Sequence, residues 1–162
     1  DQYELAEDIL EKAGYVHYEI SNWAKEGNEC RHNLVYWHNL PYLGIGAAAH
    51  SCLEGRRMAN TADLDKYLEQ FTGKPLWAPE IDEGISPELE LAETIILGLR
   101  LVEGVKVEAV NKKYKTNVLN RFWQQIQEMT GVGLLALVNG RLVLTPRGRL
   151  LSNQVFYRFL PD

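Results

Sequence analysis

The sequence predicts an α/β fold in the first half of the chain and a mostly helical, winged-helix-like domain in the second half. Three observations support this. A helix pattern followed by a strand pattern opens the chain, as in α/β units. Residues 72–85 are rich in glycine and proline and show no periodicity, as in linkers. Beyond them, helical patterns surround one β-hairpin signal.

The first part begins with an amphipathic helix over residues 3–13. Leu5, Ile9 and Ala13 recur at helical spacing and form one apolar stripe, and Gly14 ends the helix. The residues that follow are rich in aromatic and β-branched side chains, which is typical of a strand. Because no strand precedes this first helix, we expect the chain to be the tail of a longer α/β protein.

Shorter elements complete the first part. Residues 42–53 are small and apolar on both faces, which predicts a buried strand. Residues 55–58 begin a returning strand, and residues 61–69 predict a short helix. Asn60 or Thr61 is expected to cap that helix, and no periodic pattern is clear between residues 22 and 40.

The net charge changes sign at the expected linker. Residues 1–85 carry 7 Lys/Arg against 15 Asp/Glu, a balance of 7 − 15 = −8. Residues 86–162 carry 10 against 7, a balance of 10 − 7 = +3. We therefore divide the chain into a first part at 1–71, a linker at 72–85 and a second part at 86–162.

The second part begins with Ser86 as N-cap and Pro87 at the first helical position. This helix is expected to continue to about Val102, before Gly104. Further helices are expected over residues 106–114 and 118–129, the latter with an apolar face of Leu119, Phe122, Trp123, Ile126 and Met129.

A β-hairpin follows these helices. Asn139-Gly140 lies between two apolar runs, which predicts a type I′ turn. Thr145-Pro146 then starts a last helix. The order of three helices, a hairpin and a helix predicts a winged-helix-like domain, with Leu151, Val155 and Phe159 on the last helix.

A winged-helix domain raises the hypothesis of DNA binding through the helix before the hairpin. That helix carries one cation, Arg121, whereas a phosphate-binding surface needs clustered Lys and Arg. Lys112, Lys113 and Lys115 cluster on the preceding segment instead. We therefore favour a domain that docks on the rest of the protein, and expect no nucleic-acid partner.

Composition excludes several classes of protein. Two cysteines are too few for a disulfide framework and favour a reducing cytoplasm. No apolar stretch approaches the ~20 residues of a membrane helix, and the chain opens without a signal-peptide pattern. At most, we expect peripheral contact with a membrane.

Two segments contain residues that could carry chemistry. His32 can ligate a metal or haem iron, and the nearby Tyr36 and Trp37 can stack on a planar macrocycle. The alternative is that these side chains pack a loop. Cys30 lies close to His32, but their spacing to His50 and Cys52 matches no standard zinc site.

The second segment is Gly44-Ile-Gly-Ala-Ala-Ala-His50. Glycines at a strand end allow a ligand to approach the backbone, or allow tight packing of a buried strand. Ala49 replaces the third glycine of a dinucleotide-binding motif, and no apolar-periodic helix follows. Both interpretations of the glycines remain open.

Five stretches, in order along nearly the whole chain, resemble the HemW branch of the radical S-adenosylmethionine proteins. This branch is related to oxygen-independent coproporphyrinogen III oxidase. The resemblance implies that the first part is the end of a partial (β/α) barrel. The stretches are Tyr18-Glu-Ile-Ser-Asn-Trp-Ala24, Glu29-Cys-Arg-His-Asn-Leu-Val-Tyr-Trp37, Tyr42-Leu-Gly-Ile-Gly-Ala-Ala-Ala-His-Ser51, Leu97-Gly-Leu-Arg-Leu-Val-Glu-Gly-Val105 and Arg141-Leu-Val-Leu-Thr-Pro-Arg-Gly-Arg-Leu-Leu-Ser152.

The resemblance also implies roles for particular residues. The His-Asn-x-x-Tyr-Trp motif of HemW-type proteins falls on His32, Asn33, Tyr36 and Trp37, which would bind haem. His32 would ligate the haem iron. The related oxidases lack this motif, which favours a haem chaperone over an oxidase.

The family's Gly-x-Gly strand falls on Gly44, Ile45 and Gly46, and the resemblance places it near the adenine of S-adenosylmethionine. His50 occupies a position that can contact that cofactor. Ala48 departs from the glycine more usual at its position, where a methyl group would crowd a close approach.

The cysteine motif that holds a [4Fe–4S] cluster in this family is absent from the sequence. We therefore expect cluster and radical chemistry to belong to a missing N-terminal half, and expect no enzyme activity from this chain alone. The favoured function of the intact protein is haem binding and transfer to haem-acceptor proteins. The alternative is oxidative decarboxylation of coproporphyrinogen III, an oxidoreductase activity.

Overall fold

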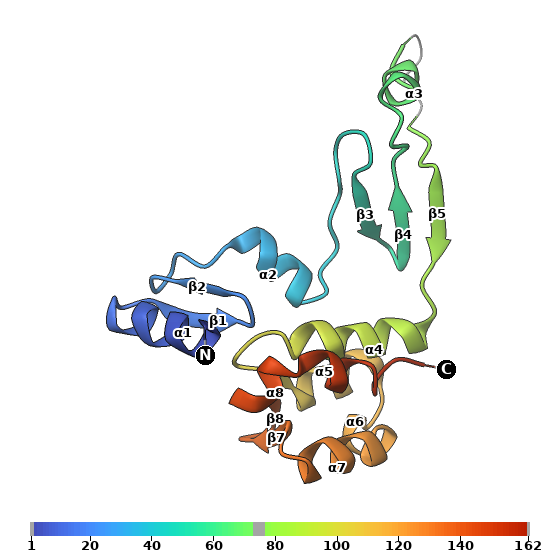
Figure 1. Ribbon diagram of the computed structural model, residues 1–162. Coiled ribbons are helices and arrows are strands. Elements are labelled where there is room, and N and C mark those ends of the chain that lie inside the picture. The colour runs from blue at the N-terminus through green and yellow to red at the C-terminus, as the bar shows by residue number, and fades with distance from the viewer. Residues whose placement is uncertain (1, 73–76, 162) are drawn as a thin grey trace. The chain divides into compact units, whose positions relative to one another are not determined.

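The chain folds into two compact units. The structure is a computed structural model that describes residues 2–72 and 77–161 (Figure 1). The first unit combines the chain up to residue 39 with the chain from residue 91 onward, and the second unit spans residues 40–90. The fold is mixed α/β, as predicted, and every paired strand within the described ranges is antiparallel. No described helix is long and apolar enough to span a bilayer.

The first unit opens with α1 (Gln2–Lys12), β1 (Val16–Glu19) and β2 (Asn22–Ala24). The predicted order of helix, glycine and strand is confirmed, and Gly14 adopts a φ of 76° where the helix ends. The sequence did not predict β2, which pairs with β1 to form a hairpin.

The apolar stripe of α1 does not form its buried face. Leu5 and Ile9 are 59% and 56% exposed, and Ala13 is exposed too. The helix instead contacts the hairpin through polar groups: the Tyr3 hydroxyl donates to the Ile20 carbonyl at 2.9 Å. Burial raises the pKa of that hydroxyl, which keeps it protonated as a donor.

The chain from Ser86 onward, of which residues 86–90 belong to the second unit and the rest to the first, confirms several local signals. The Ser86 hydroxyl, just before α4, accepts a hydrogen bond from Leu89 N at 3.2 Å. Asn139 and Gly140 have φ values of 50° and 74°, as a type I′ turn requires. The elements are α4 (Pro87–Gly98), β6 (Val105–Lys106), α5 (Val107–Tyr114), α6 (Val118–Arg121), α7 (Trp123–Gly131), β7 (Leu135–Val138), β8 (Arg141–Leu144), α8 (Pro146–Leu150) and α9 (Ser152–Phe156).

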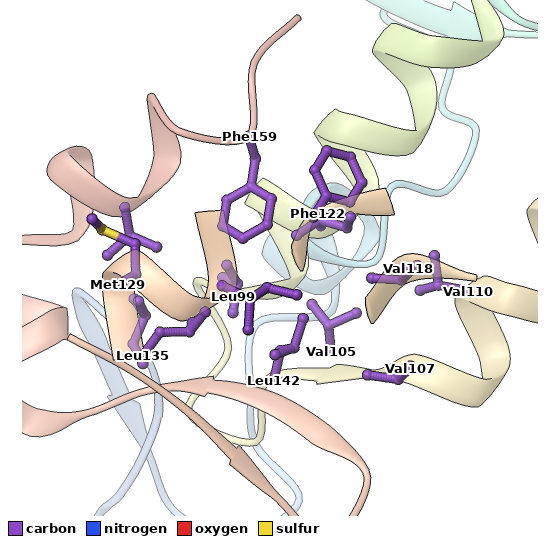
Figure 2. Close-up of a cluster of buried hydrophobic side chains, with 14 of the residues drawn as sticks. Leu99, Val105, Val107, Val110, Val118, Phe122, Met129, Leu135, Leu142 and Phe159 are labelled. Atoms are coloured by element: carbon purple, nitrogen blue, oxygen red, sulfur yellow. The ribbon is translucent and has the colours of Figure 1, made fainter. Parts of the chain in front are cut away.

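One hydrophobic core holds these C-terminal elements together (Figure 2). The strands lie in the order β6-β8-β7, so the short β6 extends the hairpin by one strand. The rings of Phe122 and Phe159 pack with centroids 5.3 Å apart. Trp123, predicted for the apolar face, is 61% exposed, and the single helix expected over residues 118–129 is divided at Phe122 into α6 and α7.

The N-terminal hairpin is joined to the C-terminal part of the first unit. Ile20 N donates to the Arg100 carbonyl at 3.0 Å, and Val102 N donates to the Tyr18 carbonyl at 3.1 Å. Arg149 also pairs with Glu7 at 3.1 Å. Segments distant in the sequence therefore form one packed unit.

The second unit contains a three-stranded sheet of β3 (His50–Leu53), β4 (Arg56–Ala59) and β5 (Ile81–Gly84), in that order. The returning strand is confirmed as β4. The segment predicted as a linker contains β5, which pairs with β4 and was not predicted. Gly73 and Pro75 of that segment lie outside the described residues.

Two further predictions for the second unit are corrected. The buried strand expected over residues 42–53 is a loop up to His50, because Gly46 and Ala48 adopt positive φ values, which a strand cannot contain. The short helix is α3 (Leu64–Glu69), and its N-cap is Asp63, whose carboxylate accepts from two helix amides.

Candidate functional site

The four residues predicted to bind haem all lie in or at the end of one short helix, α2 (Arg31–Trp37). The sequence did not predict this helix. Residues four apart lie on the same helix face, so His32 is next to Tyr36 and Asn33 is next to Trp37. His32 is exposed, whereas the other three are partly buried.

His32 and Tyr36 form a defined pair. Their ring centroids are 4.8 Å apart with an interplanar angle of 83°. The Tyr36 hydroxyl is 2.9 Å from His32 Nε2 and hydrogen-bonded to it. The other ring nitrogen, Nδ1, makes no hydrogen bond with any described residue, so the imidazole keeps one nitrogen for a further ligand.

This donor set suits a haem iron better than a bare metal ion. No group of three His, Cys, Asp or Glu side chains that could hold a metal exists within residues 2–72 and 77–161. Haem supplies four nitrogens of its own and requires one axial ligand from the protein. An exposed imidazole with a free nitrogen beside an aromatic ring meets that requirement, and Cys30 is a second exposed donor nearby.

Trp37 is held differently from His32. The guanidinium carbon of Arg100 lies 4.1 Å from the centroid of the Trp37 ring. The indole Nε1 is buried and has no hydrogen-bond partner among the described residues. One face of Trp37 is therefore covered by the protein itself, and this residue anchors α2 at least as much as it offers a surface to a macrocycle.

Arg100 in turn pairs with a fully buried carboxylate. Glu19 is 0% exposed, and its carboxylate accepts from Arg100 at 3.3 Å and from the Ser21 amide at 3.1 Å. The Asn22 side-chain amide donates to the same carboxylate. Sequence reasoning missed Glu19 and Arg100, because no local spacing predicts a contact between residues so far apart in the chain.

The second predicted set, Gly44, Ile45, Gly46 and His50, lies in the second unit, in the loop that leads into β3. A Cβ at Gly44 would lie 2.2 Å from the His50 carbonyl oxygen. Close packing of the loop therefore requires this glycine, with or without a ligand.

Hydrogen bonds fix the shape of the same loop. Gly44 N donates to Ser51 Oγ at 2.9 Å, and Gly46 N donates to the Tyr67 hydroxyl at 3.1 Å. The Asn60 amide donates to the Gly46 carbonyl at 2.8 Å. These groups already form hydrogen bonds within the unit. The groups that remain accessible to a ligand are therefore mainly the exposed side chains of the loop.

Two of those exposed side chains belong to the predicted set. Ile45 is 85% exposed at the tip of the loop. His50 is exposed, with Nδ1 3.1 Å from the Ala48 carbonyl. An apolar side chain and an imidazole at one loop can contact a planar base.

Comparison with known proteins shows what this chain is similar to. Residues 85–151 match the family described as the HemN C-terminal domain. The chain is 38% identical over its full length to the "Heme chaperone HemW" of Lactococcus lactis and 34% identical to that of Bacillus subtilis. It spans 42% of the length of each of these relatives.

The fold also matches a solved structure. Coproporphyrinogen III oxidase (HemN) from Escherichia coli, described as a radical SAM enzyme, aligns with a TM-score of 0.73 at 16% identity. The alignment covers 96% of this chain and 39% of the oxidase. At this identity the match establishes the fold alone.

Residues 85–151 are therefore similar to the HemN C-terminal domain, and the fold of the chain resembles that of the oxidase. Over its full length the chain is similar to a part of proteins named heme chaperone HemW, as the resemblance predicted.

Proposed function

We propose that this chain is the haem-binding C-terminal part of a radical S-adenosylmethionine haem chaperone, and that His32 is an axial ligand of the haem iron. The observation that supports it most directly is the exposed His32 ring with one nitrogen free of hydrogen bonds. Relatives named as haem chaperones over the full length of the chain support the same role.

The chain's own residues would orient the ligand. The Tyr36 hydroxyl is hydrogen-bonded to Nε2 of His32, and when Nε2–H donates to that oxygen, Nδ1 keeps the lone pair that would bind iron. Asn33 and Tyr36 lie on the same helix and would contact the edge of the macrocycle. Bound haem would supply the iron whose coordination His32 completes, and acceptor proteins would compete for it.

Replacement of His32 tests this proposal. In the full-length protein, His32→Ala is expected to weaken haem binding by about tenfold or more and to change the Soret absorption, because the iron loses a ligand. His38→Ala removes an exposed histidine just after the same helix and serves as the matched control. The assignment is wrong if titrations of His32→Ala and wild type coincide.

We further propose that the loop with Gly44, Ile45, Gly46 and His50 contacts S-adenosylmethionine bound by the N-terminal part of the intact protein. The exposure of Ile45 and His50 supports this. The [4Fe–4S] cluster would be held there too, since Cys30 and Cys52 cannot supply a three-cysteine motif.

In the intact protein, each part of the chain would have a different structural role. We propose that residues 1–71 complete a partial (β/α) barrel, that residues 72–85 join it to the next domain, and that residues 86–162 form a winged-helix-like cap. The strand order β6-β8-β7, with β6 between α4 and α5 and the β7-β8 hairpin after α7, supports the winged-helix assignment. Such a protein would act in the cytoplasm.

A further inference from the structure

The helix that carries the haem motif is attached to its unit mainly at its C-terminal end. α2 has seven residues, and none of them is buried. At its N-terminal end Cys30 and His32 are exposed, and Cys30 provides no side-chain cap. A helix this short is not stable by itself, so tertiary contacts must hold it in place.

Two contacts at the other end hold the helix. The Trp37 ring stacks on the Arg100 guanidinium, with 4.1 Å between ring centroid and guanidinium carbon. One residue past the C-cap, Asn39 Nδ2 donates to Thr94 Oγ1 at 2.9 Å, and that hydroxyl is 2.7 Å from the Tyr114 hydroxyl. Thr94 and Tyr114 belong to α4 and α5, so α2 is joined to the C-terminal helices.

Arg100 is held by contacts other than the one it makes with Trp37. Its carbonyl accepts from Ile20 N at 3.0 Å, and its guanidinium donates to Glu19 at 3.3 Å. The Glu19 carboxylate is fully buried, so it depends on this cation to compensate its charge. A guanidinium paired in this way presents a flat face to the indole ring.

We infer that the Glu19–Arg100 pair is the positioning element of the haem motif. It fixes Trp37, and through the rigid helix it fixes the orientation of His32. A seven-residue helix is about 10 Å long, so a small tilt at Trp37 displaces His32 by ångströms. The inference rests on the proposed role of His32, and it assigns Arg100 a function without contact with haem.

The test removes the pair together, because Arg100→Ala alone would leave Glu19 charged and buried. The double variant Glu19→Gln/Arg100→Met is made in the full-length protein, and Arg100→Lys is a second variant that keeps Glu19 paired. The control is Glu128→Gln/Arg158→Met, which makes the same side-chain changes at an exposed pair with a 2.8 Å contact far along the chain.

Two measurements follow. In haem-free protein, amide hydrogen exchange at Leu34, His38 and Asn39 is expected to accelerate by about tenfold in both Arg100 variants, because both lose the flat guanidinium that stacks on Trp37. In haem titrations the dissociation constant is expected to rise about tenfold, with an unchanged absorption spectrum at saturation. The control should match wild type in both measurements.

The outcomes separate the two proposals. Wild-type exchange in α2 of the Arg100 variants overturns the positioning role. So does a wild-type haem dissociation constant for these variants when His32→Ala binds weakly. If His32→Ala itself behaves as wild type, the proposed ligand is wrong, and amide exchange alone then decides whether Glu19 and Arg100 position the helix.

Discussion

Ala48 occupies a backbone conformation that suits glycine. Its φ is 59°, in the left-handed region, where a Cβ atom approaches the following carbonyl. The sequence predicted that a methyl group at this position would crowd a close approach. The structure shows a different unfavourable effect, which is strain in the backbone of Ala48 itself.

Ala48→Gly is therefore expected to stabilise the chain. Relief of left-handed strain contributes about 1–2 kcal/mol, and the added flexibility of the unfolded chain removes about 0.5–1 kcal/mol of that gain. Thermal unfolding measures the difference. Ala47, the preceding residue, has a negative φ, so Ala47→Gly should lower the stability instead. Equal effects of the two substitutions would show that the backbone of Ala48 is not strained.

At the scale of single elements, Thr145 joins α8 to the hairpin. Its hydroxyl accepts from Gly148 N at 2.9 Å and donates to the Gly133 carbonyl at 2.8 Å. Thr145→Ala removes both bonds and should lower the free energy of unfolding by about 1–2 kcal/mol. Thr145→Ser keeps the hydroxyl and should retain most of the stability in denaturant titrations. Equal losses would mean that the methyl group matters instead.

Elements with a local signal could be predicted, and elements that depend on tertiary contacts could not. Gly14, Ser86-Pro87 and Asn139-Gly140 each act through their own backbone, and the turns and helix starts they predict are present. α2 has no buried residue and no side-chain cap, so nothing in its spacing distinguishes it from a loop. The strand expected at Gly44 fails because backbone torsions near it are positive, which composition does not show.

At the scale of the whole molecule, the sequence could supply the residues of the candidate site but not their support. His32 and Tyr36 were found through a motif, and their contact follows from helical spacing once α2 is known. Glu19 and Arg100 meet only after the N-terminal hairpin packs beside the end of α4. Contacts of this kind depend on the complete fold, and the motif gives no indication of them.

The charge pattern of the whole chain also bears on the DNA-binding hypothesis. Several of the arginines that give residues 86–162 their positive net charge already form ion pairs with carboxylates. Arg141 pairs with Glu103 at 3.2 Å, and Arg158 pairs with Glu128 at 2.8 Å. Arg149 pairs with Glu7 at 3.1 Å. These pairs reduce the positive potential available for a phosphate backbone.

We therefore expect no binding to random duplex DNA. Non-specific binding is electrostatic and strengthens as salt falls, so the most sensitive condition is low salt, about 50 mM. A mobility shift at ~10 µM protein should be absent under that condition. A variant with both Glu103→Gln and Glu128→Gln serves as the comparison. It leaves two arginines without their carboxylate partners, so any affinity of this surface for DNA should be higher in the variant than in the wild type. A salt-dependent shift of the wild-type chain would instead show that its remaining lysines form a phosphate-binding surface.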